Sequence, residues 1–212
     1  SMELNEVVKV LFEKLNELQI PSTAVAIQTF TDDSKDMDVF VCGDVGTGLV
    51  INQYHLPYFE HPIINDYIRA HEESLAFYKG EYSVAEKDSF YDVVLKLPEL
   101  TNLPSEVERM IHKSSHYSVT MAPSGKSIVA VNDFVGKPLS EPDIAILKRF
   151  SKVFDQAYTR FLDLQKAEAQ TREAKIETAL ERIRTQSMLM QHSEQLDETL
   201  GVFHEQVSML GI

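Results

Sequence analysis

The sequence has a single cysteine, no tryptophan, and only 8 glycines and 8 prolines among its 212 residues. One thiol excludes an internal disulfide. So little glycine and proline argues against a disordered chain and favours a folded, helix-rich one. Apolar runs are also short, since none approaches the length of a membrane-spanning helix, roughly 20 residues, or of the apolar core of a secretion signal. We therefore expect a folded cytoplasmic protein without a membrane partner.

Basic residues are scarce as well. The chain has 20 Lys and Arg against 33 Asp and Glu, which gives a formal net charge of −13. Nucleic-acid binding depends on clustered basic side chains that neutralise phosphates. The charge therefore predicts no nucleic-acid partner.

What is present starts with an amphipathic segment at residues 3–20. Its apolar residues recur at alternating steps of four and three, which predicts a helix with a narrow apolar seam. Such a seam suits packing against a partner helix. The seam consists of Leu4, Val8, Leu11, Leu15 and Leu18.

Three runs rich in β-branched residues follow at 23–30, 37–43 and 48–56, and they predict strands. Cys42 falls in the second and is expected to be a buried structural thiol. A helix is predicted over 61–80, because Pro62 stands near its start, Gly80 at its end, and apolar residues lie between at helical spacing.

Residues 81–115 give no clear pattern apart from a helical stretch at 106–114. Residues 115–136 then read as a β-hairpin around Pro123-Ser124-Gly125. Together these elements predict an α+β fold with an antiparallel sheet of five to six strands.

The last element is a helix with Ser140 as its N-cap. After Pro142 there is no further proline, and the next glycine is Gly201. Helices in compact domains usually span about 8–20 residues. This helix is therefore expected to leave the domain.

The order helix, three strands, helix, irregular segment, hairpin and exiting helix resembles that of GAF domains, which are small sensor modules. Residues 129–154, VAVNDFVGKPLSEPDIAILKRFSKVF, are similar to the closing segment of that family, where a strand ends in Asn and Ser-x-x-Asp opens the last helix. The resemblance covers residues 3 to about 161 and implies a GAF-like sheet with helices on both faces. The related PAS domains share much of this order and stay an alternative.

The end of the chain resembles its beginning. Residues 195–212 align without a gap with residues 3–20, so that the seam recurs as Leu196, Leu200, Phe203, Val207 and Leu210. This predicts a sensor domain at 3–160, a signalling-helix or coiled-coil linker at 161–192, and at 193–212 the first helix of a truncated second repeat. Chance similarity of two amphipathic helices is the alternative.

No catalytic motif stands out, so we expect no enzymatic activity. The segment 43–48 lacks the Lys-Ser/Thr ending of a phosphate-binding loop. His112 and His116 are four residues apart but span an expected change from helix to strand, which argues against a shared metal. The position of Cys42 does not match the bilin attachment site of GAF domains, and their cyclic-nucleotide signature survives only as Asn132 and Asp143, so neither cofactor is expected.

The resemblance implies a regulatory module that relays a small-molecule or conformational signal through a parallel homodimer. The signal would reach an output domain that is not in this sequence, and we expect this domain to be a histidine kinase of a two-component system. A nucleotide cyclase or phosphatase output, or a dimerisation scaffold without a ligand, are the alternatives. An unidentified small molecule would meet aromatic residues around 52–62 and beyond, while the dimer would use the seam of the first helix and that of the last. The expected pocket residues are Tyr54, His55, Tyr58, Tyr78 and Tyr91, and the expected dimer seam is Leu4, Val8, Leu11, Leu15, Leu18, Phe154, Phe161 and Leu164.

Overall fold

The computed structural model describes residues 2–31, 34–46, 48–189 and 196–209. The chain divides into two compact units, Ser1–Ala157 and Tyr158–Ile212. The expected domain end at residue 160 lies close to this division. None of the described helices combines the length and the apolar character that crossing a membrane requires.

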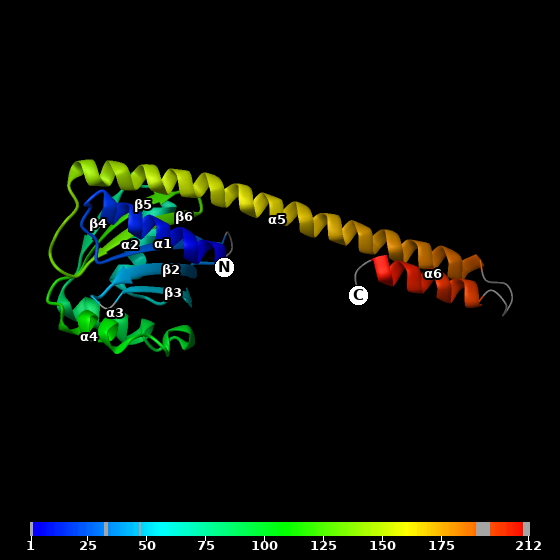
Figure 1. Ribbon diagram of the computed structural model, residues 1–212, viewed down its shortest axis with the longest axis horizontal. Helices are drawn as coiled ribbons and strands as arrows, with labels where there is room; N and C mark the ends of the chain where they lie inside the picture. Colours follow the sequence, from blue (N-terminus) through cyan, green and yellow to red (C-terminus); the bar gives the residue numbers. More distant parts are fainter. Residues whose placement is uncertain (1, 32–33, 47, 190–195, 210–212) are drawn as a thin grey trace. The chain divides into compact units, whose positions relative to one another are not determined.

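The first unit contains a six-stranded sheet in which every neighbouring pair is antiparallel (Figure 1). This confirms the predicted α+β class and the antiparallel sheet. The strand order is β3-β2-β1-β6-β5-β4. The strands are β1 (Ala24–Phe30), β2 (Met37–Asp44), β3 (Leu49–Leu56), β4 (Tyr78–Glu81), β5 (Ser118–Ser124) and β6 (Ser127–Asp133).

Helices cover both faces of the sheet. Helix α1 (Met2–Glu17) and the first part of α5 (Glu141–Leu189) lie on one face, where the Ser151 hydroxyl of α5 donates a hydrogen bond to the Ala122 carbonyl of β5. The other face carries α2 (Pro62–Glu72), α3 (Val84–Val94), the short 3-10 helix η1 (Pro98–Leu100) and α4 (Ser105–Lys113). Double coverage explains why every residue of β1 from Val25 to Phe30 is buried.

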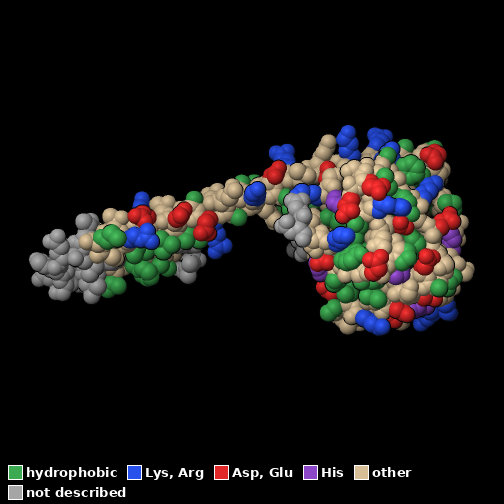
Figure 2. Space-filling model, turned by 180° about the vertical axis from the view of Figure 1, so that it is seen from behind, with side chains coloured by type: hydrophobic (Ala, Val, Ile, Leu, Met, Phe, Trp, Pro, Cys, Tyr) green, Lys and Arg blue, Asp and Glu red, His purple; other side chains and the backbone are tan. Residues whose placement is uncertain are grey.

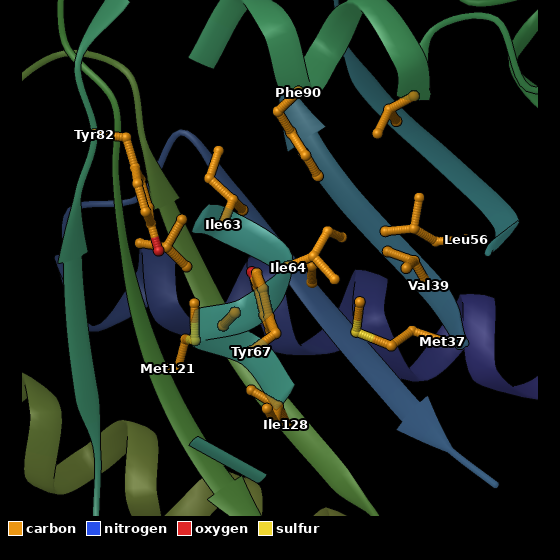
Figure 3. Packing of buried hydrophobic residues seen from close by; sticks show 14 of the residues in the cluster. Met37, Val39, Leu56, Ile63, Ile64, Tyr67, Tyr82, Phe90, Met121 and Ile128 are labelled. Carbon is orange, nitrogen blue, oxygen red and sulfur yellow. The ribbon is translucent and has the colours of Figure 1, made fainter. Parts of the chain in front are cut away.

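The larger part of the core lies between the sheet and α2. Figure 3 shows Ile63, Ile64 and Tyr67 of α2 among Met37 and Val39 of β2, Leu56 of β3 and Ile128 of β6. The polar His61 begins α2, because its side chain accepts a hydrogen bond from the Ile63 N–H and so caps the helix.

The predicted helix over 61–80 is too long. Helix α2 ends at Glu72, and Ser74 has a positive φ of 49°, which is incompatible with a continuing helix. The chain then returns as β4, an edge strand paired with β5. Gly80 is required there, since a Cβ at this position would overlap the ring of Tyr82.

The hairpin of β5 and β6 is confirmed, with its turn slightly later than predicted. Ser124 pairs with Ser127, so Gly125 and Lys126 form the loop. Gly125 has a φ of +51°, as the first loop position of a two-residue hairpin with a primed turn requires.

The second unit holds the remainder of α5 and α6 (Leu196–Met209). Helix α5 is 49 residues long, which confirms the predicted long C-terminal helix. Ala179 of α5 and Gln206 of α6 are buried, and both line one shallow groove between the two helices. The predicted start of the second repeat at residues 193–195 and its Leu210 and Ile212 lie outside the described residues.

Candidate functional site

A pocket lies between the sheet and the helices of its second face. Strands β1, β2, β3 and β6 form its floor, and α2, α3, η1 and α4 with their connections form its walls. The cavity volume is about 110 Å³. A cavity of roughly 150 Å³ holds a benzene-sized ring, so this somewhat smaller one suits a ligand no larger than a single ring. Its apolar lining includes Ala26, Met37, Val39, Phe90, Leu95, Leu103 and Ile111.

The pairing register explains which strand residues reach the floor. Gln28 pairs with Val39, and Val39 pairs with Tyr54. Directly paired residues project from the same face of a sheet, so these three side chains share the pocket face. Asn132 reaches the same face because its partner Ala24 lies four residues before Gln28 on β1.

Gln28 is the most deeply buried polar group of the floor, with 4% of its surface exposed. Its Nε2 donates a long hydrogen bond of 3.4 Å to the Tyr67 hydroxyl. Its Oε1 has no hydrogen-bond partner among the described residues. A buried amide oxygen without a partner costs about 1–3 kcal/mol, so native proteins normally supply one. The free oxygen therefore marks a position where a bound molecule would complete the hydrogen bonding.

Tyrosine hydroxyls provide further polar atoms, beside those of Thr23, Asn52 and Asn132. The Tyr91 hydroxyl donates to that of Tyr117 over 3.4 Å, and Tyr117 donates to Asn132 Oδ1 over 3.0 Å. Burial raises the pKa of Tyr91 to about 12 and also raises the pKa values of Tyr54 and Tyr117. All three hydroxyls therefore stay protonated at physiological pH and act as neutral hydrogen-bonding groups.

The described lining contains no Asp, Glu, Lys, Arg or His side chain. Burying a charged ligand without a countercharge costs far more than burying a neutral one. The lining therefore favours an uncharged molecule over a charged one. Its described residues offer no countercharge to a phosphate or a carboxylate.

Two of the five predicted pocket residues, Tyr54 and Tyr91, line the cavity. His55 does not, because it follows Tyr54 on the same strand and projects from the opposite face. There it is exposed and its Nδ1 lies 2.9 Å from Asp38 Oδ1. This hydrogen bond raises the pKa of His55.

Tyr58 and Tyr78 also lie outside the pocket lining. Tyr58 follows the end of β3, and its hydroxyl donates to Glu60 over 2.6 Å. Tyr78 belongs to the edge strand β4, and its hydroxyl donates to Asp66 over 3.0 Å. The error at Tyr78 follows from treating residues 78–80 as part of a helix.

Sequence reasoning missed Gln28, Asn52, Tyr67 and Tyr117 as pocket residues. A signal for Gln28 was available, since it is the one amide inside the otherwise apolar and hydroxyl-bearing strand AVAIQTF. The partners of Tyr67 and Tyr117 lie at least 15 residues away along the chain, and no local pattern shows them.

A buried lysine was missed too. Lys87 of α3 has no exposed surface, and its Nζ donates to the carbonyl oxygens of Ile111 and Ser114 at the end of α4. A helix C-terminus favours a cation because its last carbonyls have no partner within the helix. Lys87 therefore fastens α3 to α4, and both helices contribute to the pocket wall.

The expected dimer seam on α1 requires a correction. Val8, Leu11 and Leu15 are buried, because this side of α1 faces the sheet of its own chain. Leu4 is half-buried and Leu18, just beyond the helix, is 52% exposed. On α5, Phe154 is buried, Phe161 is half-buried and Leu164 is exposed. The spacing of the seam was right, but four of its eight residues are core.

Other reactive side chains do not assemble a second site within the described residues. No group of three His, Cys, Asp or Glu side chains could hold a metal there. His116 Nε2 lies 3.2 Å from the Ser118 hydroxyl and 3.4 Å from Asp133 Oδ2, so both compete for one nitrogen instead of forming a relay through the ring. Burial raises the pKa of Cys42 to about 11, which leaves its thiol unreactive.

Comparison with known proteins adds no relative. No protein-family model, no curated protein and no solved structure matches this chain. The pocket of the first unit, with its neutral lining and its free Gln28 oxygen, is the feature on which a functional assignment rests.

Proposed function

We propose that this chain is a cytoplasmic regulatory sensor of the GAF type, which binds a small molecule in the pocket and passes the signal along α5 to an output domain. The observation that carries the proposal is the unpartnered oxygen of Gln28 inside a cavity of about 110 Å³. Small-molecule sites are typically concave and mostly apolar with a few placed polar groups, as this pocket is. The resemblance favours a histidine kinase as the output.

The connection from pocket to α5 supports a relay. Asn132 lines the pocket, and the next residue, Asp133, organises the loop that leads to α5. The Asp133 carboxylate accepts hydrogen bonds of 2.8, 3.1 and 2.6 Å from the N–H groups of residues 135, 136 and 137. A ligand that moves Asn132 therefore acts on a loop held by its neighbour.

Phe134 gives a second contact along this route. Its ring centroid lies 4.8 Å from that of Tyr117 and 5.9 Å from that of Tyr91, so it packs against both pocket tyrosines. At the far end of the loop Lys79 donates to the Leu139 carbonyl. Helix α5 begins directly after it, with Ser140 and Asp143 hydrogen-bonded as a cap.

A matched pair of tryptophan variants tests the binding part of the proposal. Val50 lines the pocket, whereas its neighbour Ile51 projects from the other face of β3 and is similarly half-buried. A library of uncharged small molecules is screened by thermal shift, because binding to the native state alone raises the melting temperature. Active compounds should raise it in wild type and in Ile51→Trp but not in Val50→Trp. The absence of any active compound would favour the scaffold alternative, and an equal shift in all three proteins would place binding outside this pocket.

For the relay we propose a parallel homodimer, with the contact surface moved to the solvent side of α1 and α5. Val7 and Val10 of α1 and Val153 of α5 are exposed, and both helices cover the same sheet face. A two-fold axis there would send both α5 helices in one direction. Light scattering should find a dimer for wild type and a folded monomer for Val10→Glu/Val153→Glu. A wild-type monomer at high micromolar concentration would refute the dimer.

We also propose that α6 is the first helix of a second domain of the same kind. Leu200 and Phe203 align with Val8 and Leu11, which are buried against the sheet. Leu200 and Phe203 are instead 55% and 50% exposed. Hydrophobic side chains gather on this α5–α6 unit in Figure 2. An apolar helix face of this kind is what a second sheet would cover.

Paired serine substitutions test this repeat. Leu200→Ser/Phe203→Ser should leave the melting temperature unchanged, whereas Val8→Ser/Leu11→Ser should unfold the first unit. If both pairs lowered the melting temperature equally, α6 would already be covered and the repeat would lose its support.

A further inference from the structure

We infer that the ligand of the pocket is a small uncharged ring compound that donates an N–H or O–H hydrogen bond to Gln28 Oε1. This inference rests on the proposed function, because it assigns the chemical class that the same pocket selects. It is carried by the position of one side chain and by the chemistry of the atoms around it.

The first step is the direction of the missing hydrogen bond. Gln28 Nε2 is held by the Tyr67 hydroxyl at 3.4 Å, which leaves Oε1 as the unpartnered atom of the amide. An amide oxygen only accepts hydrogen bonds. The ligand must therefore supply a donor at this point.

The second step concerns shape. The rings of Tyr91 and Phe90 lie 5.0 Å apart at 80°, and those of Tyr91 and Tyr117 lie 5.6 Å apart at 73°. All three rings line the cavity of about 110 Å³, so its wall on this side is aromatic. A flat ring makes more contact with such walls than a branched or extended chain of the same size.

The third step concerns charge. The nearest ionisable groups of the described lining are tyrosines, whose pKa values are raised by burial. A sugar phosphate, a nucleotide or an amino acid zwitterion would enter without a countercharge. These ligand classes are disfavoured relative to a neutral ring of equal size.

Three probes of similar size separate these steps: phenol carries one donor, benzene carries none, and benzoate is an anion. Titration of ¹⁵N-labelled full chain, followed through the side-chain amide signal that Gln28→Leu removes, gives the dissociation constants. We expect phenol to bind about tenfold more tightly than benzene, as one hydrogen bond to a buried acceptor provides, and benzoate not to bind.

The variants complete the test. Gln28→Leu should weaken phenol about tenfold and leave benzene binding equal or tighter, measured on the backbone signals of β1. Gln53→Leu is the matched control, because Gln53 projects from the opposite face of the sheet, and it should change neither constant.

The two proposals fail in different ways. If benzene and benzoate bind as tightly as phenol, or if Gln28→Leu leaves phenol unchanged, the donor assignment is overturned while the pocket stands. If none of the three probes shifts any signal of the pocket residues, both the donor assignment and the binding part of the proposed function are overturned.

Discussion

The two faces of the sheet are built from the same strands and yet differ in chemistry. Beneath α1 and α5 the face consists largely of aliphatic side chains such as Val25, Ile27 and Val129, all fully buried. Beneath α2, α3 and α4 the face carries Gln28, Tyr54 and Asn132, and a cavity remains. Helices α1 and α5 fill the first face, whereas the second keeps a cavity lined by Gln28, whose Oε1 has no hydrogen-bond partner among the described residues.

This difference teaches that adjacent residues serve separate tasks. Tyr54 lines the pocket while His55 forms a surface ion pair, and Asn132 lines the pocket while Asp133 holds the loop to α5. Side chains alternate along a strand, so a shift of one position changes the face and with it the role. The strands thereby connect a pocket on one side to helices on the other.

The largest expected effect concerns the sheet face that α1 and α5 cover. Leu15 on α1 has no exposed surface, so Leu15→Ala should reduce the free energy of unfolding by about 2–5 kcal/mol through lost burial and a cavity. Leu18→Ala, at an exposed position in the same apolar seam, should stay within about 0.5 kcal/mol. Urea unfolding compares the two. Equal small effects would mean that α1 does not depend on the sheet for its packing.

On the pocket face, one substitution in the helical wall should lower the free energy of unfolding nearly as much. Lys87→Met removes the donor for two carbonyl oxygens at the end of α4 and should cost about 2–4 kcal/mol. Lys96→Met, at an exposed position of the same wall, is the control and should be close to neutral. If Lys87→Met were as stable as wild type, α3 and α4 would be held by apolar packing alone.

A moderate effect is expected where α5 meets the sheet. Ser151 is buried and donates to the Ala122 carbonyl, so Ser151→Ala should cost about 0.5–1.5 kcal/mol. The measurement is the shift of the urea midpoint at constant slope. A change of slope instead would show that α5 detaches before the sheet unfolds.

The smallest effect depends on pH. The hydrogen bond that His55 donates to the Asp38 carboxylate raises the pKa of this exposed histidine. Protonated His55 therefore stabilises the fold below its unfolded pKa of about 6.5, and this gain is lost as pH rises through the folded pKa. Wild type should exceed His55→Gln by a few tenths of a kcal/mol at pH 5.5 and match it at pH 8.5. The opposite trend between the two pH values would contradict the assigned ion pair.

Much of the fold could be predicted from local sequence. The first three strands, the hairpin and the long helix each have an uninterrupted period and clear end signals, such as Ser140 before α5. Strand β4 could not be predicted, because residues 78–81 become a strand only by pairing with β5. Their spacing fits a helix equally well, and the tertiary contact decides.

The candidate site was less accessible to sequence reasoning. Tyr54 was found because aromatic residues cluster near it, but the same cluster led wrongly to His55 and Tyr58. Deciding which of these residues face the pocket requires the exact strand register, because a shift of one residue moves each side chain to the opposite face. Lys87 could not be found at all, since the partners that join it to α4 are the backbone carbonyls of residues 24 and 27 positions further along the chain.

The most direct test of the account is hydrogen exchange of the full chain with and without saturating phenol. If the pocket is coupled to α5 through the loop after Asn132, exchange should slow both in peptides containing Gln28 and Asn132 and in the first part of α5, residues 141–157. Protection confined to the pocket strands, or no protection in any part of the first unit, would contradict the proposal that this face of the sheet senses and the opposite face transmits.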